Sequence, residues 1–280
     1  MKKVLVPTDF SANSKSGIRY AIHWSTIQKL ELVFVHVLHI SRPSKWTDAY
    51  YEKYSKEEEQ NCSIKLKKFI AGIYSSMKIK PARHAFEIIQ GISADISILN
   101  YCSSKPGFDY ICISTQGAGK LKRLWGTNTG NLITKSPVPV LAVPGAYRFT
   151  GIRRIMYAAD LRNYENELNR VVDFALPLKA NIEILHFSWP DETATGEKMK
   201  ETALNKKYKY GLKVHYENND AVHSLTENIQ LQINKRKPSL VIMFTNQERT
   251  FYQKLFLSSK AEELSFKTKV PLLVFIKQIK

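Results

Sequence analysis

Short, nearly continuous apolar runs alternate along the whole chain with segments in which apolar residues recur every three or four positions. The runs are typical of buried β-strands and the recurring pattern is typical of helices packed on a sheet. Strands that are apolar on both faces and alternate with helices predict a parallel sheet covered on both sides. In the first half of the chain the expected strands are Lys3–Asp9, Leu32–His39, His84–Ile89, Asp109–Ser114 and Pro139–Val143.

Helical stripes lie between these strands. Ile18, Ala21 and Ile22 mark the first, and the second carries Leu66, Phe69, Ile70, Ile73 and Met77. After the turn at Gly91, a third expected helix places Ile92, Ile96 and Leu99 on its buried face, and a fourth carries Leu132 and Ile133.

The same plan is repeated in the second half. The segment Arg154–Asp160 (RIMYAAD) has the form of Lys3–Asp9 (KVLVPTD), an apolar strand that ends in an aspartate. The later elements follow in the same order: a helix with Val171, Phe174, Ala175 and Leu178, a strand Ile182–Trp189, a weaker helix Glu197–Tyr208, a strand Leu212–Tyr216, a helix Val222–Ile233, and strands Leu240–Thr245 and Pro271–Phe275. An internal repeat of this kind predicts a duplicated domain.

We therefore expect two tandem α/β domains, each a doubly wound parallel sheet of the Rossmann-like kind, spanning residues 1–145 and 151–280. Gly145–Gly151 forms the boundary between them. A chain of 280 residues suits two domains of ordinary size.

Composition changes this picture little. The formal net charge is +17, which in principle attracts nucleic acid, anionic lipid or an acidic protein. The basic residues, however, are scattered lysines more than arginines and accompany no recognisable nucleic-acid-binding motif. The alternative is a lysine-rich solvated surface, and we do not expect nucleic acid to be the main partner.

The start of the chain and its cysteines favour a cytoplasmic protein. Residues 1–7 pass directly into a strand pattern without the features of a signal peptide, and the longest apolar run, Leu32–Ile40, is too short to cross a bilayer. Cys62, Cys102 and Cys112 form no CxxC motif and indicate free thiols.

Candidate chemistry lies where the first domain's strands end, because ligands of open parallel sheets bind beyond the carboxyl ends of the strands. Asp9 closes the first strand, between Pro7-Thr8 and Phe10-Ser11. Its carboxylate can accept hydrogen bonds from ribose hydroxyls, and equally Asp9 or Ser11 can cap the following helix.

A second feature follows the strand that ends at Ser114. The loop contains Gly117 and Gly119, and Gly126-Thr127-Asn128-Thr129 stands where a helix should begin. Glycines allow a phosphate to approach the backbone, and free amides at a helix start favour an anion. A flexible capped loop is the alternative interpretation.

These segments resemble the universal stress protein family over essentially the whole chain. The residues that carry the resemblance are Val6–Ser11 (VPTDFS), Leu32–Val37 (LVFVHV), Ser114–Thr129 (STQGAGKLKRLWGTNT) and Pro139–Val143 (PVLAV). The resemblance implies an adenine nucleotide alpha hydrolase-like fold in both domains and an ATP site, with or without Mg²⁺, in the first. It also implies pairing of domains through their last strands, either as a pseudo-dimer within the chain or as a homodimer.

The resemblance implies roles for individual residues. Asp9 would contact the ribose, Val37 would lie beside the base, and Gly117, Gly126, Thr127 and Thr129 would hold the phosphates. Pro7, Thr8, Ser114 and Asn128 complete the candidate site. ATP-binding members show G-x2-G-x9-G-[S/T] after the fourth strand, whereas here Ser114 replaces the first glycine and the later spacer is one residue shorter.

The second copy departs further from that pattern. Asp160 is retained, but the loop reads Thr245-Asn246-Gln247-Glu248, and Ser258 stands at the later glycine position. A carboxylate at Glu248 would repel a phosphate. We expect nucleotide binding in the first domain only.

No residues point to catalysis or to a bound metal. The chain has no Walker A, HExxH or serine-hydrolase motif, and His36 and His186 are expected to be hydrogen-bonded core histidines. The leading hypothesis is a cytoplasmic ATP-binding regulatory protein of the stress-response kind. The alternatives are a nucleotide-free pairing module whose basic surface meets an acidic partner, and a slow ATPase or nucleotidyl-transfer enzyme.

Overall fold

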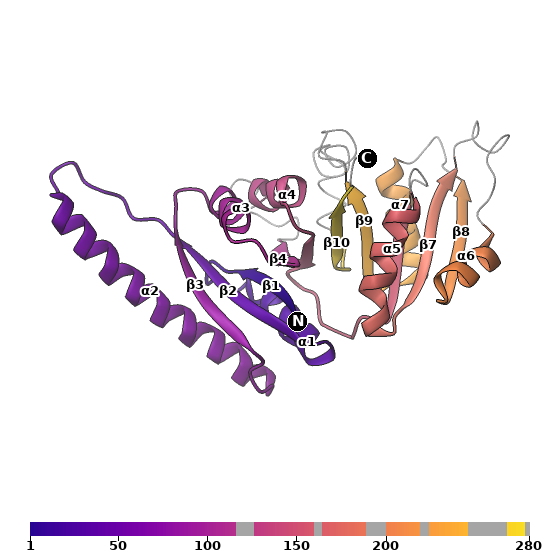
Figure 1. The fold of residues 1–280 in the computed structure, drawn as a ribbon, viewed down its shortest axis with the longest axis horizontal. Coiled ribbons are helices and arrows are strands. Elements are labelled where there is room, and N and C mark those ends of the chain that lie inside the picture. The colour runs from indigo at the N-terminus through magenta and orange to yellow at the C-terminus, as the bar shows by residue number, and fades with distance from the viewer. Residues whose placement is uncertain (116–125, 160–163, 189–199, 219–223, 246–267, 278–280) are drawn as a thin grey trace. The chain divides into compact units, whose positions relative to one another are not determined.

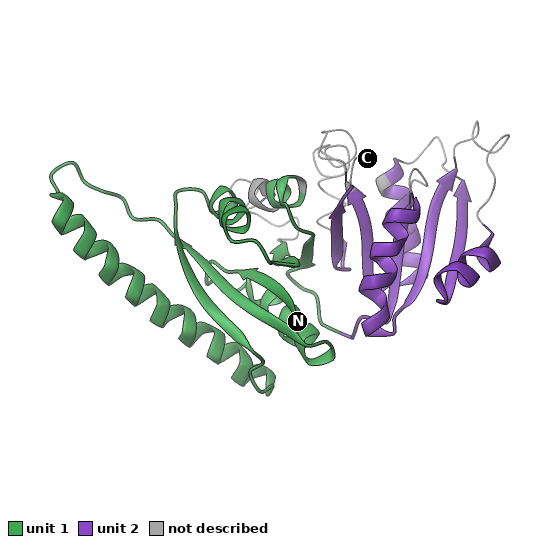
Figure 2. Cartoon of the chain, in the orientation of Figure 1, with its two compact units in different colours: residues 1–116, 121–149 green, residues 117–120, 150–280 purple. Residues whose placement is uncertain are grey.

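The computed structural model of the chain describes residues 1–115, 126–159, 164–188, 200–218, 224–245 and 268–277 (Figure 1). The chain divides into two compact units, one that ends at Phe149 and one that begins at Thr150 (Figure 2).

Unit 1 alternates strands and helices throughout. Its elements are β1 (Lys2–Pro7), α1 (Lys15–Ile27), β2 (Leu30–Leu38), α2 (Asp48–Met77), β3 (His84–Gln90), α3 (Ala94–Ser104), β4 (Tyr110–Thr115), α4 (Gly126–Lys135) and β5 (Val140–Pro144). The strands are all parallel in the order β3-β2-β1-β4-β5. Helices α1 and α2 pack on each other, as do α3 and α4, and the two pairs cover opposite faces of the sheet (Figure 1).

Unit 2 has the same sheet order. Its elements are β6 (Arg154–Ala159), α5 (Tyr164–Ala175), a 3₁₀ turn (Leu176–Leu178), β7 (Asn181–Ser188), α6 (Glu201–Tyr208), β8 (Leu212–Asn218), α7 (Leu225–Arg236), β9 (Leu240–Thr245) and β10 (Leu272–Ile276). The parallel order β10-β9-β6-β7-β8 repeats that of unit 1. The predicted pair of tandem doubly wound α/β domains is therefore confirmed.

Apolar residues fill the space between sheet and helices in both units. In unit 1, Val4, Leu5, Phe34 and Ile111 are fully buried in the strands. In unit 2, Met156, Leu185 and Val241 pack against Ile229 and Ile233 of α7. All three cysteines are buried free thiols, as expected.

The expected buried face of α3 was wrong. Ile92 is 89% exposed and Ile96 is 57% exposed, whereas Asp95, Ile98 and Cys102 are buried. The helix is rotated relative to the prediction because the buried carboxylate of Asp95 is hydrogen-bonded on both oxygens, so it replaces an apolar side chain on that face.

Helix α2 begins well before its apolar stripe. Its first half, from Asp48 to Asn61, is mostly polar and exposed. The helix start is set instead by Thr47, whose side chain accepts a hydrogen bond from the backbone of Tyr50 at 3.3 Å.

Candidate functional site

A tightly hydrogen-bonded loop follows β1 in unit 1. Thr8 Oγ1 accepts from the backbone nitrogen of Phe10 at 3.1 Å and shares a 2.8 Å hydrogen bond with Ser14 Oγ. Asp9 Oδ1 accepts from the backbone of Ser11 at 3.0 Å, and Ser11 Oγ accepts from the backbone of Ser14 at 3.1 Å. Short polar side chains thus satisfy the backbone of this loop locally.

Neither Asp9 nor Ser11 is the N-cap of α1, which is Ser14. The carboxylate of Asp9 serves the turn through Oδ1, and the described residues provide no partner for Oδ2. One oxygen of Asp9 is therefore available to an incoming hydroxyl or amine.

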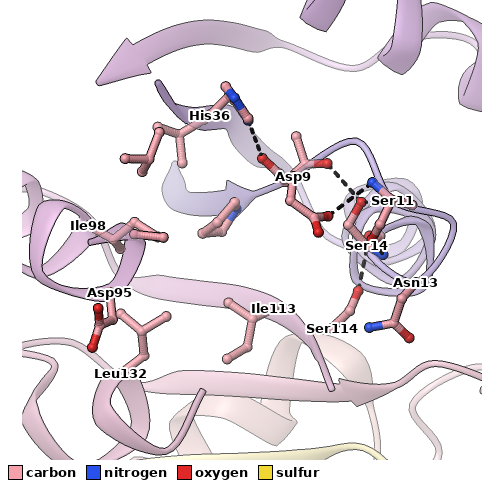
Figure 3. A pocket seen from close by; sticks show the side chains of 15 residues that line it. Asp9, Ser11, Asn13, Ser14, His36, Asp95, Ile98, Ile113, Ser114 and Leu132 are labelled. Atoms are coloured by element: carbon pink, nitrogen blue, oxygen red, sulfur yellow. Dashed lines mark hydrogen bonds between the residues drawn. The ribbon is translucent and has the colours of Figure 1, made fainter. Parts of the chain in front are cut away.

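A cavity of about 230 Å³ lies at the carboxyl ends of β1, β2 and β4. This is the switch point of the sheet, where the chain order reverses between β1 and β4. One side of the cavity is polar and is lined by Thr8, Asp9, Ser11, Asn13, Ser14 and His36. The other side is largely apolar and is lined by Val35, Val37, Ile98, Ile113 and Leu132, with α3 and α4 supplying Ile98 and Leu132 (Figure 3).

His36 is hydrogen-bonded within the fold, as its place in an apolar strand predicts. Its Nδ1 lies 2.8 Å from the carbonyl oxygen of Thr8, and in unit 2 the Nδ1 of His186 lies 3.0 Å from the carbonyl of Ala159. Burial lowers the pKa of His36, a shift that the Thr8 hydrogen bond opposes and the charge of Lys65 reinforces. His36 therefore lines the cavity as a neutral ring at neutral pH.

Ser114 lines the cavity but its hydroxyl is occupied by α1. Its Oγ accepts from the backbone nitrogen of Gly17 at 2.8 Å and from Ser16 Oγ at 3.0 Å, and it donates to the carbonyl of Ser14 at 3.0 Å. The serine that stands at the family's first glycine thus fastens β4 to the start of α1, and its side chain has no hydrogen left to donate to a phosphate.

Asp95 is a cavity residue that the sequence analysis missed. It lies in the first turn of α3, is 3% exposed, and accepts hydrogen bonds from Ser93 Oγ and, at 2.7 Å, from Asn131 Nδ2 of α4. Burial alone raises the pKa of this carboxyl, but the hydrogen bonds from Ser93, from Asn131 and from nearby backbone amides outweigh that effect and lower the pKa. The serine two residues earlier, in Gly91-Ile92-Ser93, was the only sequence signal for this role.

The structure brings five of the candidate residues to one cavity: Pro7, Thr8, Asp9, Val37 and Ser114. Gly126 begins α4, as expected, and Thr127, Asn128 and Thr129 follow in its first turn. The side chains of these α4 residues, and all of Gly117, lie outside the described part of the chain.

The corresponding position of unit 2 is filled by larger side chains. The strand pairings of β4 and β9 place Phe244 where unit 1 has Ser114. Aligning α1 with α5 by their buried positions places Glu167 where unit 1 has Gly17. Glu167 accepts a hydrogen bond from Tyr157 and lies 3.2 Å from the ammonium of Lys277.

An arginine closes this cluster in unit 2. The guanidinium of Arg170 lies 4.6 Å from the ring centroid of Phe275 and 5.6 Å from that of Phe244, and it donates to the carbonyl of Ile276 at 2.7 Å. Asp160, Glu248 and Ser258, on which the sequence comparison of the two copies rested, lie outside the described residues.

Comparison with known proteins bears on the family and the fold. Among the described residues, no helix is both long enough and apolar enough to pass through a membrane. No curated protein sequence matches the chain. Solved structures that align over nearly its full length include a universal stress protein from Archaeoglobus fulgidus, with 16% identity, a TM-score of 0.66 and coverage of 98% of this chain and 96% of the other. They also include a putative universal stress protein from Pseudomonas aeruginosa, with 13% identity, a TM-score of 0.55 and coverage of 99% and 93%.

A universal stress protein solved in complex with cAMP aligns with 51% of this chain and 96% of its own, at 13% identity and a TM-score of 0.38. A similarity this weak does not bear on what the present cavity binds. The sequence model of the universal stress protein family matches residues 1–144, which is slightly more than half of the chain. The chain therefore belongs to the universal stress protein family.

Proposed function

We propose that unit 1 binds an adenine nucleotide, with ATP as the expected ligand, and that the protein is a nucleotide-regulated member of its family. The observation that carries this proposal is the cavity at the switch point of the sheet, with Asp9 at its polar side.

The cavity suits the nucleoside end of such a ligand. Asp9 Oδ2 is available to accept from ribose hydroxyls, and Val37, Ile98 and Leu132 form an apolar wall against which a base can pack. Its volume is below the range of about 300–1,000 Å³ that is usual for pockets that hold a whole drug-sized ligand. In this proposal the cavity takes the nucleoside, and the phosphates lie beyond it.

The phosphates would then extend toward the start of α4. This helix begins at Gly126 and packs against β4 and β5, so its first turn belongs to the same end of the sheet as the cavity. Free backbone amides and the helix dipole at such a start stabilise an anion. The expected contacts of Gly117, Thr127 and Thr129 with the phosphates remain part of the proposal.

A magnesium ion would come with the nucleotide rather than occupy a site of its own. Within the part of the chain that the structure describes, no group of three or more His, Cys, Asp or Glu side chains gathers to hold a metal. Mg²⁺ commonly binds through phosphates and water with few protein ligands.

Unit 2 is proposed not to bind the nucleotide. Phe244 and Glu167 replace the small Ser114 and Gly17, and the Glu167 carboxylate is already paired with Lys277. The larger side chains leave less room for a ligand at this end of the sheet.

The test is calorimetric titration of ATP and of adenosine into the full chain and two α4 variants. Gly126→Asp puts a carboxylate at the helix start and should weaken ATP binding by about tenfold or more, with little change for adenosine. Gly130→Asp is the matched control, because an added Cβ at Gly130 meets nothing within 4 Å. It should weaken ATP binding much less. Equal ATP affinity in the wild type and Gly126→Asp would contradict the placement of the phosphates.

Turnover is tested separately. Prolonged incubation with ATP and Mg²⁺ should release no ADP or AMP above the rate without protein. Stoichiometric or repeated product formation would instead support the slow-enzyme alternative.

A further inference from the structure

Phe10, the residue after Asp9, has an unusual backbone conformation. Its φ is +64°, in the left-handed region that bulky L-residues rarely occupy. Glycine would adopt this conformation without steric cost. The contacts of the phenyl ring must therefore explain why phenylalanine, rather than glycine, occupies this position.

Three side chains surround that ring. The His36 ring lies 4.3 Å from it, centroid to centroid, and Phe69 meets it edge-on at 5.5 Å. The ammonium of Lys65 lies 4.5 Å from the centroid of the Phe10 ring, within the range of a cation–π interaction. Phe69 and Lys65 belong to consecutive turns of α2, so this helix holds the ring from one side and β2 holds it through His36.

The left-handed turn places the side chains of Asp9 and Phe10 in different surroundings. Asp9 lines the cavity, whereas Phe10 does not and packs instead against α2. The backbone of the turn is fixed by hydrogen bonds on both sides of Phe10, from Phe10 nitrogen to Thr8 and from Ser11 nitrogen to Asp9 Oδ1. The turn thereby holds the Asp9 carboxylate through Oδ1 beside Ser11 at the cavity (Figure 3).

We propose that Phe10 is a positioning residue that α2 holds in place, and that through it Lys65 and Phe69 set how strongly Asp9 recognises ribose hydroxyls. This inference rests on the proposed nucleotide site. It extends the site to a helix that contributes no residue to the lining of the cavity, and it makes ribose selectivity sensitive to any change in how α2 packs.

The experiment compares the dissociation constants of ATP and 2′,3′-dideoxy-ATP, which lacks both ribose hydroxyls. The wild type should prefer ATP by about tenfold or more, because a hydrogen bond to a carboxylate is lost with the analogue. Phe10→Gly relieves the steric strain of the left-handed backbone but removes the ring. Phe69→Ala leaves Phe10 in place and removes the contact of its ring with Phe69 of α2. Both should reduce the preference to about twofold or less while the affinity for the dideoxy nucleotide is kept.

Ile64→Ala is the matched control, since Ile64 lies in the same helix and is 65% exposed. It should retain the wild-type preference. Phe10→Leu, which keeps an apolar side chain without an aromatic face, provides a second variant at the site if Phe10→Gly unfolds, as judged by circular dichroism; it too should lower the preference.

The outcomes separate the two proposals. A wild type that prefers ATP, together with variants at positions 10 and 69 that keep this preference, overturns the role of Phe10 and leaves the nucleotide site intact. A wild type that binds neither nucleotide overturns the proposed function and this inference with it.

Discussion

The hydroxyl oxygen of Ser114 accepts a hydrogen bond from the backbone nitrogen of Gly17 across 2.8 Å, which joins the end of β4 to the first turn of α1. The backbones of α1 and β4 also approach each other closely at this point. A Cβ added at Gly17 would lie 2.9 Å from the backbone carbon of Ile113 and 2.9 Å from the backbone nitrogen of Ser114. Gly17 therefore lets α1 approach the sheet beside the cavity.

Gly17→Ala should destabilise the protein, by about 1–3 kcal/mol, because the added methyl group meets backbone atoms that cannot rotate away. This is opposite to the usual gain from replacing a helical glycine with alanine. Gly72→Ala in α2 is the control, since nothing lies within 4 Å of its added Cβ, and it should stabilise by about 0.5–1 kcal/mol. Urea unfolding midpoints of the two variants measure both effects; a neutral or stabilising Gly17→Ala would contradict the close approach.

Ser114→Ala should cost about 1–3 kcal/mol of stability, because it leaves the buried amide of Gly17 without this acceptor. The hydroxyl of Ser16 loses one acceptor and keeps the carbonyl of Asn13. Ser104→Ala removes a hydroxyl from an exposed position of α3 and should change stability by less than about 0.5 kcal/mol. If the two substitutions have the same effect in denaturant unfolding, the Ser114 hydroxyl does not fasten α1.

The Asp95 carboxylate should make the free energy of unfolding fall as the pH becomes acidic. Its pKa is lower in the folded protein than the ordinary value, so its ionised form stabilises the fold above the unfolded pKa of about 3.9. That contribution is lost as the pH falls from there through the lowered folded pKa. The stability difference between wild type and Asp95→Asn should therefore be present at pH 6 and shrink below pH of about 4.

Asp173→Asn, at an exposed position of α5, serves as the comparison for Asp95→Asn. Its effect on the unfolding free energy should be small at both pH values. A difference for Asp95→Asn that grew toward acidic pH would show that the carboxyl is not stabilised in its ionised form.

The sequence predicted the order and type of the elements because apolar periodicity reports burial directly. It failed at α3, where Asp95 takes a buried position that hydropathy assigns to Ile96; hydrogen bonds from Ser93 and Asn131 make that burial possible, and Asn131 is 36 residues away in the chain. Asp9 and Val37 could be placed at the cavity because both lie near strand ends. The engagement of Ser114 with α1 could not, because a hydroxyl in the sequence does not show which partner it will meet in the fold.

The central claim is that one adenine nucleotide binds per chain, with Asp9 at its ribose. Titration calorimetry of ATP into the wild type, Asp9→Asn and Asp160→Asn tests it most directly, since asparagine keeps an Oδ1 acceptor for Ser11 but replaces the charged Oδ2 acceptor with an NH2 donor. We expect one site per chain, an affinity lowered about tenfold or more in Asp9→Asn, and an unchanged affinity in Asp160→Asn. No binding by the wild type, two sites per chain, or a loss caused by Asp160→Asn rather than Asp9→Asn would contradict it.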